Sequence, residues 1–123
     1  MNRGTNYLLD MGDGTIIDAH AALMWQKATA GPMDWSDAMS YASGLSLGGN
    51  SNWRLPTKEE LEGLFNSECK KLMDVQSTRY WSSTPHDVYT VTAWGVDFPS
   101  GKVDFHFMVN SYYVRVVRSG FYL

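Results

Sequence analysis

The chain has 123 residues, long enough for one domain with a substantial core but too short for two. Its 13 acidic and 10 basic residues give a formal charge of -3, which argues against nucleic acid or an acidic membrane surface as a partner. The single cysteine, Cys69, excludes an intrachain disulfide and any multi-cysteine metal site, and no cofactor is expected.

No stretch of the sequence is apolar for long enough to cross a membrane, and the N-terminus lacks the apolar run of a secretory signal. We therefore expect a soluble domain without membrane insertion, for which a place on a cell surface or virion would require another component. The sequence predicts neither the host compartment nor the oligomeric state.

The first third of the chain predicts short strands around turns. Residues 7–10 and 15–18 flank Met11-Gly12-Asp13-Gly14, whose Asp-Gly pair favours the positive φ of a hairpin turn. Residues 21–26 follow as a short apolar segment that includes Trp25. Residues 29–33, which contain Gly31-Pro32, are predicted to be a loop.

Two helices are predicted next, each with its own start signal. Asp34 is a good N-cap, and apolar residues from Trp35 to Leu45 recur at helical spacing. Thr57 and Glu60 have the spacing of a capping box, in which each side chain binds the backbone amide of the other residue. This second helix is predicted from about residue 58 to residues 66–67, and its pattern allows it to reach residue 71.

The last third has the alternating pattern of strands. Strands are predicted at residues 80–84, 94–98, 103–107 and 113–118, with a turn at residues 99–101. Trp94 alternates with Val96 and Phe98, so we expect it on the core face. Together the elements predict an α+β fold, with two helices packed on a twisted, mainly antiparallel β-sheet.

Several short motifs follow one another along nearly the whole chain: Asp13-Gly14-Thr15, Leu23-Met24-Trp25-Gln26, Trp35-Ser36-Asp37-Ala38, Leu47-Gly48-Gly49, Asn52-Trp53-Arg54-Leu55-Pro56-Thr57, Glu60-Leu61, Tyr80-Trp81-Ser82-Ser83-Thr84, Ala93-Trp94, Asp97-Phe98, Ser100-Gly101 and Val114-Arg115-Val116-Val117-Arg118. In this combination the sequence resembles the C-terminal domain family of the collagen-like bacterial adhesin Lcl. The resemblance implies a single C-type-lectin-like domain over residues 1–123, akin to formylglycine-generating enzymes and phage tropism determinants. It implies a scaffold at about 1–83, a variable ligand-binding region at about 84–113 and a final core strand at about 113–119.

The chain departs from relatives of this fold in two respects. The family pattern often carries cysteines where this sequence has Ala42, or a residue near it, and Val116, so a disulfide between those places is absent. The Glu-Pro-Asn and Gln-Pro-Asp motifs of calcium-dependent lectins are also missing, and Gly12-Asp13-Gly14 lacks the alternating oxygen ligands of an EF-hand. No calcium site is therefore expected.

Many relatives of this family are targets of diversity-generating retroelements, which rewrite adenines, largely in AAC codons. Residues that this process can produce exclude Lys, Glu, Gln, Met and Trp, and between His86 and Tyr112 only Trp94, Lys102 and Met108 fall outside the set. The alternative is that strands are poor in Lys, Glu and Gln for their own reasons. The mixture of polar and aromatic residues nevertheless resembles a binding surface.

We therefore predict that a hypervariable surface binds an unidentified macromolecule, either a protein or a glycan on a cell surface. Its contact residues are predicted to be His86, Asp87, Val88, Tyr89, Thr90, Thr92, Gly95, Asp97, Asp104, His106, Asn110 and Tyr112. A second set belongs to the motifs shared with the family and is predicted to form the structural scaffold: Trp25, Trp53, Arg54, Thr57, Glu60, Trp81, Trp94, Arg115 and Arg118.

Other functions remain as alternatives. A glycan-binding adhesin with a fixed site would use Arg115 or Lys102 in a basic cleft, although arginines in the family motifs are better explained by ties within the scaffold. His20, His86 and His106 lack the spacing of metal ligands, so no metal is expected. An enzyme of the formylglycine-generating type needs more than the lone Cys69, and no catalytic residues are predicted.

Overall fold

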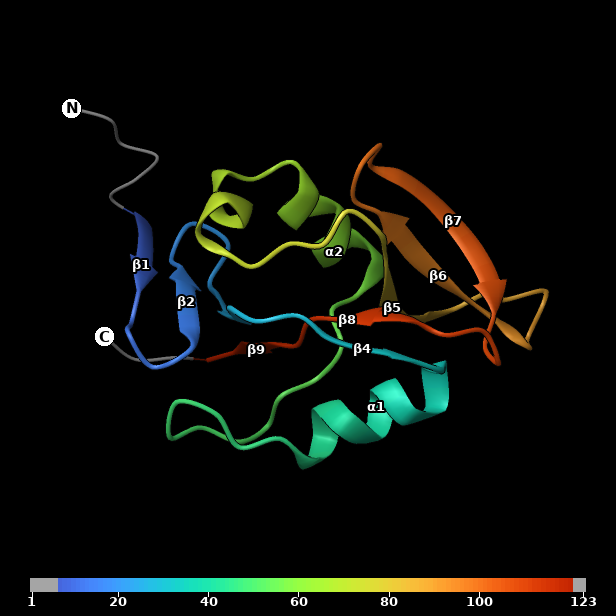
Figure 1. The fold of residues 1–123 in the computed structure, drawn as a ribbon, viewed down its shortest axis with the longest axis horizontal. Helices are drawn as coiled ribbons and strands as arrows, with labels where there is room; N and C mark the ends of the chain where they lie inside the picture. The colour runs from blue at the N-terminus through green and yellow to red at the C-terminus, as the bar shows by residue number, and fades with distance from the viewer. Residues whose placement is uncertain (1–6, 121–123) are drawn as a thin grey trace.

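Two β-sheets and two α-helices make up residues 7–120, the part of the chain that the computed structural model describes (Figure 1). The small sheet has the strand order β1 (Leu8–Asp10), β2 (Thr15–Asp18), β3 (Leu23–Gln26) and β9 (Val117–Ser119). The large sheet has the order β4 (Ala30–Met33), β8 (Tyr112–Val114), β5 (Arg79–Pro85), β6 (Thr92–Asp97) and β7 (Lys102–Phe107). The predicted α+β class is confirmed, but the strands form two mainly antiparallel sheets rather than the single sheet predicted.

The first hairpin forms where the turn signals predict it. β1 pairs antiparallel with β2, and Gly12 and Gly14 both have positive φ, at 75° and 90°. The Asp13 carboxylate accepts hydrogen bonds from the backbone amide and the hydroxyl of Thr15, which fixes the end of the turn. β3 then pairs with β2 and extends the sheet.

Both predicted helices form with their predicted caps. α1 (Trp35–Gly44) begins after Asp34, whose Oδ1 accepts a hydrogen bond from Asp37 N at 2.8 Å. α2 (Lys58–Phe65) begins after Thr57 with both hydrogen bonds of the capping box. The α-helix does not continue to residue 71, because the chain turns at residues 66–67 and resumes as the 3-10 helix η2 (Glu68–Leu72).

The segment predicted to be a loop at residues 29–33 contains a strand instead. β4 pairs with β8 at Ala30–Val114 and Met33–Tyr112, with a register irregularity between them. Proline lacks an N–H donor and is therefore tolerated in a strand only at an edge or bulge. β4 is the edge of the large sheet, so Gly31-Pro32 marks an edge strand rather than a loop.

The α-helices lie on opposite faces of the large sheet (Figure 1). On the α2 side, Leu61 and Leu64 share one core with Tyr80 and Val96. On the α1 side, Ala38, Ala42, Trp81 and Val114 belong to a second core. The small sheet lies at one end of the molecule, and the β6–β7 hairpin lies at the other (Figure 1).

The final strand predicted at residues 113–118 is two strands in two different sheets. β8 belongs to the large sheet and β9 to the small sheet, with Arg115 and Val116 between them. Arg115 is only 1 % exposed, and its guanidinium donates to the carbonyls of Gln26, Lys27, Ala28 and Asp74. The chain therefore passes from the large sheet to the small sheet at the buried Arg115. The alternation of apolar residues in this segment does not predict that break.

The Arg115 guanidinium is held by neutral acceptors, with Thr29 Oγ1 at 2.8 Å from Nη2. Burial lowers the pKa of Arg115, and the Tyr80 hydroxyl opposes part of that effect. Arg115 thus joins the end of β3, the start of β4 and the segment after η2.

Replacing Arg115 should severely destabilise the fold. Arg115→Met fills similar space but removes a hydrogen bond from each of the four carbonyls, so we expect a loss of about 3–5 kcal/mol in the free energy of unfolding. Arg115→Lys should lose less, because one ammonium can satisfy part of the acceptor set. Denaturant unfolding of both variants measures this order. Wild-type stability of Arg115→Met would contradict the role of the cation.

Candidate functional site

Two loops meet at the end of the large sheet farthest from the small sheet. One loop, residues 86–91, connects β5 to β6, and the other, residues 108–111, connects β7 to β8. Met108 N donates a hydrogen bond to Val91 O at 2.9 Å, which ties the loops together. We call these two segments the tip loops.

Large apolar side chains are unusually exposed at the tip loops. Val88, Tyr89, Val91 and Val109 lie within the loops, and Phe107 lies at the adjoining end of β7; Val109 is the most exposed at 83 %. A pocket of about 330 Å³ opens beside three of them, Tyr89, Val91 and Phe107, and is also lined by Thr92 and Phe105. Contiguous exposed apolar surface on a folded protein marks an interaction site.

The His86 side chain lies inside the loop of residues 86–91 and is not part of its exposed surface, where it was predicted to be. Its imidazole is stacked on Trp94 and meets the edge of Phe105, with ring centroids 5.2 and 4.5 Å apart. His86 Nδ1 accepts hydrogen bonds from the backbone amides of Val88 and Tyr89. Only 13 % of the His86 side chain is exposed, so this residue acts as an internal anchor of the loop.

The prediction that Trp94 is a core residue is wrong. Trp94 is half-buried and lies beneath His86 on the α2 side of the sheet, with Lys58 Nζ 4.4 Å from its ring centroid. Alternation correctly puts Trp94 on the same face as Val96. That face, however, is covered by α2 at Val96 and by the loop residue His86 at Trp94.

Two predicted contact residues are inside the molecule. Thr92 is 4 % exposed, and its hydroxyl donates to Tyr89 O, which closes the loop. Gly95 is also buried, and a Cβ atom placed there would lie 2.7 Å from Tyr80 O. Both predictions are corrected: Thr92 and Gly95 support the surface and do not form it.

The other predicted contact residues occupy three different places. Asp87, Val88, Tyr89, Thr90 and Asn110 are exposed in the tip loops. Asp97 lies at the opposite end of β6, where its carboxylate accepts a hydrogen bond from Ser100. Asp104, His106 and Tyr112 are half-buried, and the His106 and Tyr112 rings are 5.2 Å apart.

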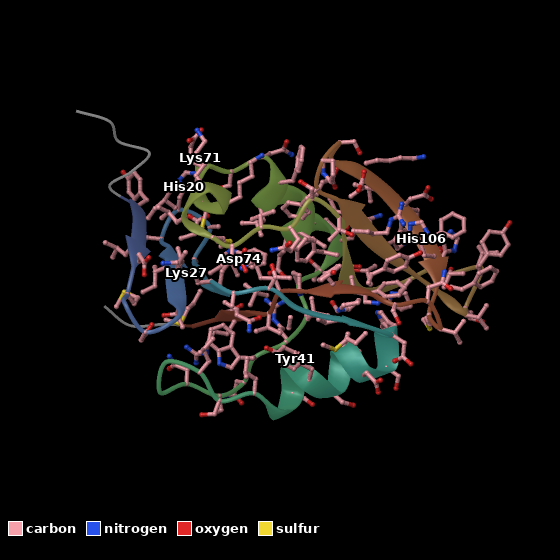
Figure 2. The ribbon with its side chains drawn as sticks, in the orientation of Figure 1. His20, Lys27, Tyr41, Lys71, Asp74 and His106 are labelled. Atoms are coloured by element: carbon pink, nitrogen blue, oxygen red, sulfur yellow. The ribbon has the colours of Figure 1, made fainter. Side chains whose placement is uncertain are left out.

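His106 belongs to the β6–β7 part of the large sheet (Figure 2). Burial and the neighbouring Arg79 lower its pKa, and its Nε2 atom has no hydrogen-bond partner among the described residues. The pKa of Asp104 is lowered, chiefly because its carboxylate accepts a hydrogen bond from Phe105 N. The twelve predicted residues therefore do not form one continuous site.

Sequence reasoning named only part of the apolar surface. Val88 and Tyr89 were in the predicted contact set, whereas Val91, Phe105, Phe107 and Val109 were not named in it. The available signal was the composition of the loops themselves: Val88-Tyr89-Thr90-Val91 and Val109-Asn110-Ser111 place large apolar residues where connecting segments are usually polar.

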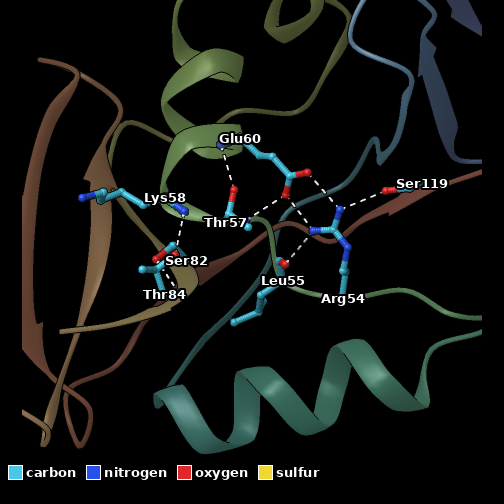
Figure 3. A network of polar contacts seen from close by, with 8 residues as sticks. All are labelled: Arg54, Leu55, Thr57, Lys58, Glu60, Ser82, Thr84 and Ser119. Atoms are coloured by element: carbon cyan, nitrogen blue, oxygen red, sulfur yellow. Dashed lines mark hydrogen bonds and ion pairs between the residues drawn. The ribbon is translucent and has the colours of Figure 1, made fainter. Parts of the chain in front are cut away.

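The capped start of α2 is joined to the small sheet and to β5. Arg54 Nη1 and Nη2 donate to the two carboxylate oxygens of Glu60 at 2.6 and 2.9 Å, and Nη2 also donates to Ser119 (Figure 3). Lys58 N donates to Thr84 Oγ1, which joins the helix to β5 (Figure 3). The Arg54 guanidinium therefore binds acceptors within the protein, as expected of a scaffold residue.

The remaining predicted scaffold residues are also engaged internally. Trp25, Trp53 and Trp81 are almost completely buried, and the Trp81 indole donates to Met33 O at 3.0 Å. Trp53 Nε1 donates to Asn50 O, and Arg118 Nε donates to Ser51 O. The arginines of the motifs thus face protein acceptors.

The model of the Lcl C-terminal domain matches residues 14–118, which run from the first turn into β9 and leave out β1. The chain belongs to this family. The Lcl C-terminal domain assignment indicates an adhesin-like or binding domain. No curated protein matches the chain.

Cys69, the single cysteine of this Lcl C-terminal domain, lies in its interior. Cys69 is fully buried, and burial, with a further contribution from Asp18, raises the pKa of its thiol to about 12. Among residues 7–120, no group of three or more His, Cys, Asp or Glu side chains is placed to hold a metal ion. Within the same residues, no helix is long and apolar enough to cross a membrane.

Gly95 provides a test of which positions tolerate change. Gly95→Ala should lower the free energy of unfolding by about 1–3 kcal/mol, because its methyl group would overlap the Tyr80 backbone. Gly63→Ala in α2 is the matched control: nothing lies within 4 Å of its added Cβ, and we expect a gain of about 0.5–1 kcal/mol. Denaturant unfolding measures both. Equal stability of the two variants would contradict the close approach at Gly95.

Glu60 provides a test of the Arg54 contact through pH. Burial opposes ionisation of Glu60, but hydrogen bonds from Arg54 and the Thr57 amide outweigh it and lower its pKa. The stabilisation should therefore be complete above the unfolded-state pKa of about 4.3 and should disappear as pH falls through the lower folded-state pKa.

Glu60→Gln keeps the capping-box geometry but removes the charge, and should cost about 1 kcal/mol at pH 7. Unfolding curves of wild type and variant between neutral and strongly acidic pH measure the difference. It should shrink in acid, and a difference independent of pH would refute the ionic contribution.

Proposed function

We propose that this Lcl C-terminal domain is a non-enzymatic recognition module that binds a macromolecular ligand through its tip loops. The observation that carries the proposal is the exposure of five large apolar side chains, Val88, Tyr89, Val91, Phe107 and Val109, at the junction of these loops. A surface of this composition fits a protein ligand best, since the pocket among them is lined almost entirely by apolar and aromatic groups.

In the proposed mechanism, the exposed side chains of the tip loops are presented on loops that are ordered before the ligand binds. His86 binds two loop amides, Thr92 closes the same loop through Tyr89 O, and the Trp94 and Phe105 rings fill the space beneath. A loop ordered before binding loses less conformational entropy when the ligand arrives. The side chains above this frame can then determine the partner without contributing much to folding.

We further propose that the tip loops are the diversified part of a retroelement variable protein with a C-type-lectin-like fold. The exposure of Asp87, Val88, Tyr89, Thr90 and Asn110 supports diversification there. Diversification at Gly95 is disfavoured, because a side chain at that position would overlap the neighbouring strand. Variable positions should therefore concentrate in the loops and be excluded from the interior of β6.

The proposal of a binding protein rather than an enzyme is supported by the state of the single thiol. Formylglycine-generating chemistry needs an accessible thiolate, whereas Cys69 is buried with its pKa raised. A fixed basic glycan site has less support: Arg115, one of its two predicted cations, is engaged by backbone carbonyls inside the protein. Lys102 remains exposed, 3.6 Å from the Asp104 carboxylate.

Removing the apolar tip should abolish ligand binding and leave the fold intact. The variant Val88→Ser/Val91→Ser/Val109→Ser changes three exposed side chains, so each should alter stability by no more than about 0.5 kcal/mol. Flow cytometry of the fluorescently labelled domain on a panel of bacterial and animal cells measures binding, and thermal unfolding measures stability.

Leu9→Ser is the matched control, since Leu9 is an exposed apolar residue in β1 at the other end of the molecule. We expect the control to bind like wild type and the triple variant to lose binding. Equal binding by the triple variant would refute the assigned surface. The diversification proposal has its own test: sequencing around the gene should find a reverse transcriptase and a template repeat that differs at adenines, and their absence would overturn it.

A further inference from the structure

β7 is an edge strand of the large sheet, at the side opposite to β4. It pairs antiparallel with β6, and among residues 7–120 no strand pairs with its other side. Because Met108 N bonds to Val91 O, the pairs that exchange hydrogen bonds with β6 are those at Lys102, Asp104 and His106. The backbone groups of Val103, Phe105 and Phe107 therefore point outward, as a short template for another strand.

One carboxylate occupies the middle of this template. Asp104 Oδ1 accepts a hydrogen bond from Phe105 N at 2.9 Å, and Lys102 Nζ lies 3.6 Å from Asp104 Oδ2. The outward amide at the centre of the edge is therefore already satisfied within the chain. Charged residues on edge strands are a common means of preventing unwanted pairing.

We propose that the β7 edge is a self-pairing surface for a second copy of this chain, and that the Asp104 carboxylate keeps it closed by capping the Phe105 amide. Removing the cap frees the central N–H. Two β7 strands then pair antiparallel across a two-fold axis and join the two large sheets into one.

Side-chain complementarity selects the register of this pairing. An axis at Phe105 places Val103 opposite Phe107 of the second copy, and Asp104 opposite its His106. Opposite-charge and hydrogen-bonding pairs across strands are favourable, whereas like charges are not. Moving the axis to Asp104 would place two aspartates opposite each other, and moving it to His106 would place two histidines opposite each other. The register about Phe105 avoids both.

The test compares self-association of the full chain by sedimentation velocity over a wide range of protein concentration. Asp104→Ala removes the cap and should associate about tenfold more tightly than wild type. The hydrogen bond that no longer has to be broken in each copy outweighs the loss of the Asp104–His106 pair across the interface. Asp104→Asn is the matched control: its amide oxygen can still accept from Phe105 N, so it should remain close to wild type.

A second substitution shows whether the association uses this edge. Phe107→Pro removes an outward N–H that β6 does not use, so Asp104→Ala/Phe107→Pro should return to the wild-type state. Circular dichroism and thermal unfolding verify that each variant is folded. Unchanged association in Asp104→Ala, equal association in Asp104→Asn, or association that survives Phe107→Pro would overturn the proposal. The assay contains no ligand, so it is independent of binding at the tip loops.

Discussion

The fold depends on one buried cation. Arg115 lies where the chain leaves the large sheet for the small one, and its guanidinium binds the carbonyls at the end of β3 and after η2. A charge in such a place is costly to desolvate, and it is tolerated because nearly every donor has an acceptor. The bonds are directional and come from segments far apart in sequence, so they set how the two sheets meet. Everything built on the large sheet, including the tip loops, inherits that geometry.

The support beneath the tip loops is graded from interior to surface. Val96 and Ala93 are completely buried, Trp94 and Phe105 are half-buried, and Val91 and Val109 are exposed. Each layer packs on the one beneath it. The Trp94 indole stacks on the His86 imidazole, and His86 Nδ1 accepts hydrogen bonds from two loop amides. The outermost side chains contribute little packing, so they can differ in chemistry at little cost to the fold. This separation of stability from recognition is the physical basis of the proposed function.

Local signals predicted the local structure well. The Asp-Gly turn, the Asp34 cap and the Thr57–Glu60 capping box depend on residues within four positions of one another, and all three form. The errors concern long-range partners. Pro32 lies in an edge strand rather than a loop because β4 pairs with β8. The environment of Trp94 depends on His86, which stacks on its ring, and the constraint on Gly95 comes from the Tyr80 carbonyl. The exposed tip was only partly predicted: its polar residues and the apolar Val88 and Tyr89 were named, whereas Val91, Phe107 and Val109 were not.

The placement of the small sheet at one end of the molecule has a mechanical consequence. β1 and β9, the first and last strands, both belong to that sheet, whereas the tip loops lie at the far end of the large sheet (Figure 1). A stalk or carrier joined next to either strand would meet the domain at the pole opposite the loops. The loops would then project away from the carrier, free of steric interference from it. Tension along such a stalk would act first on the β1–β2 and β3–β9 pairings.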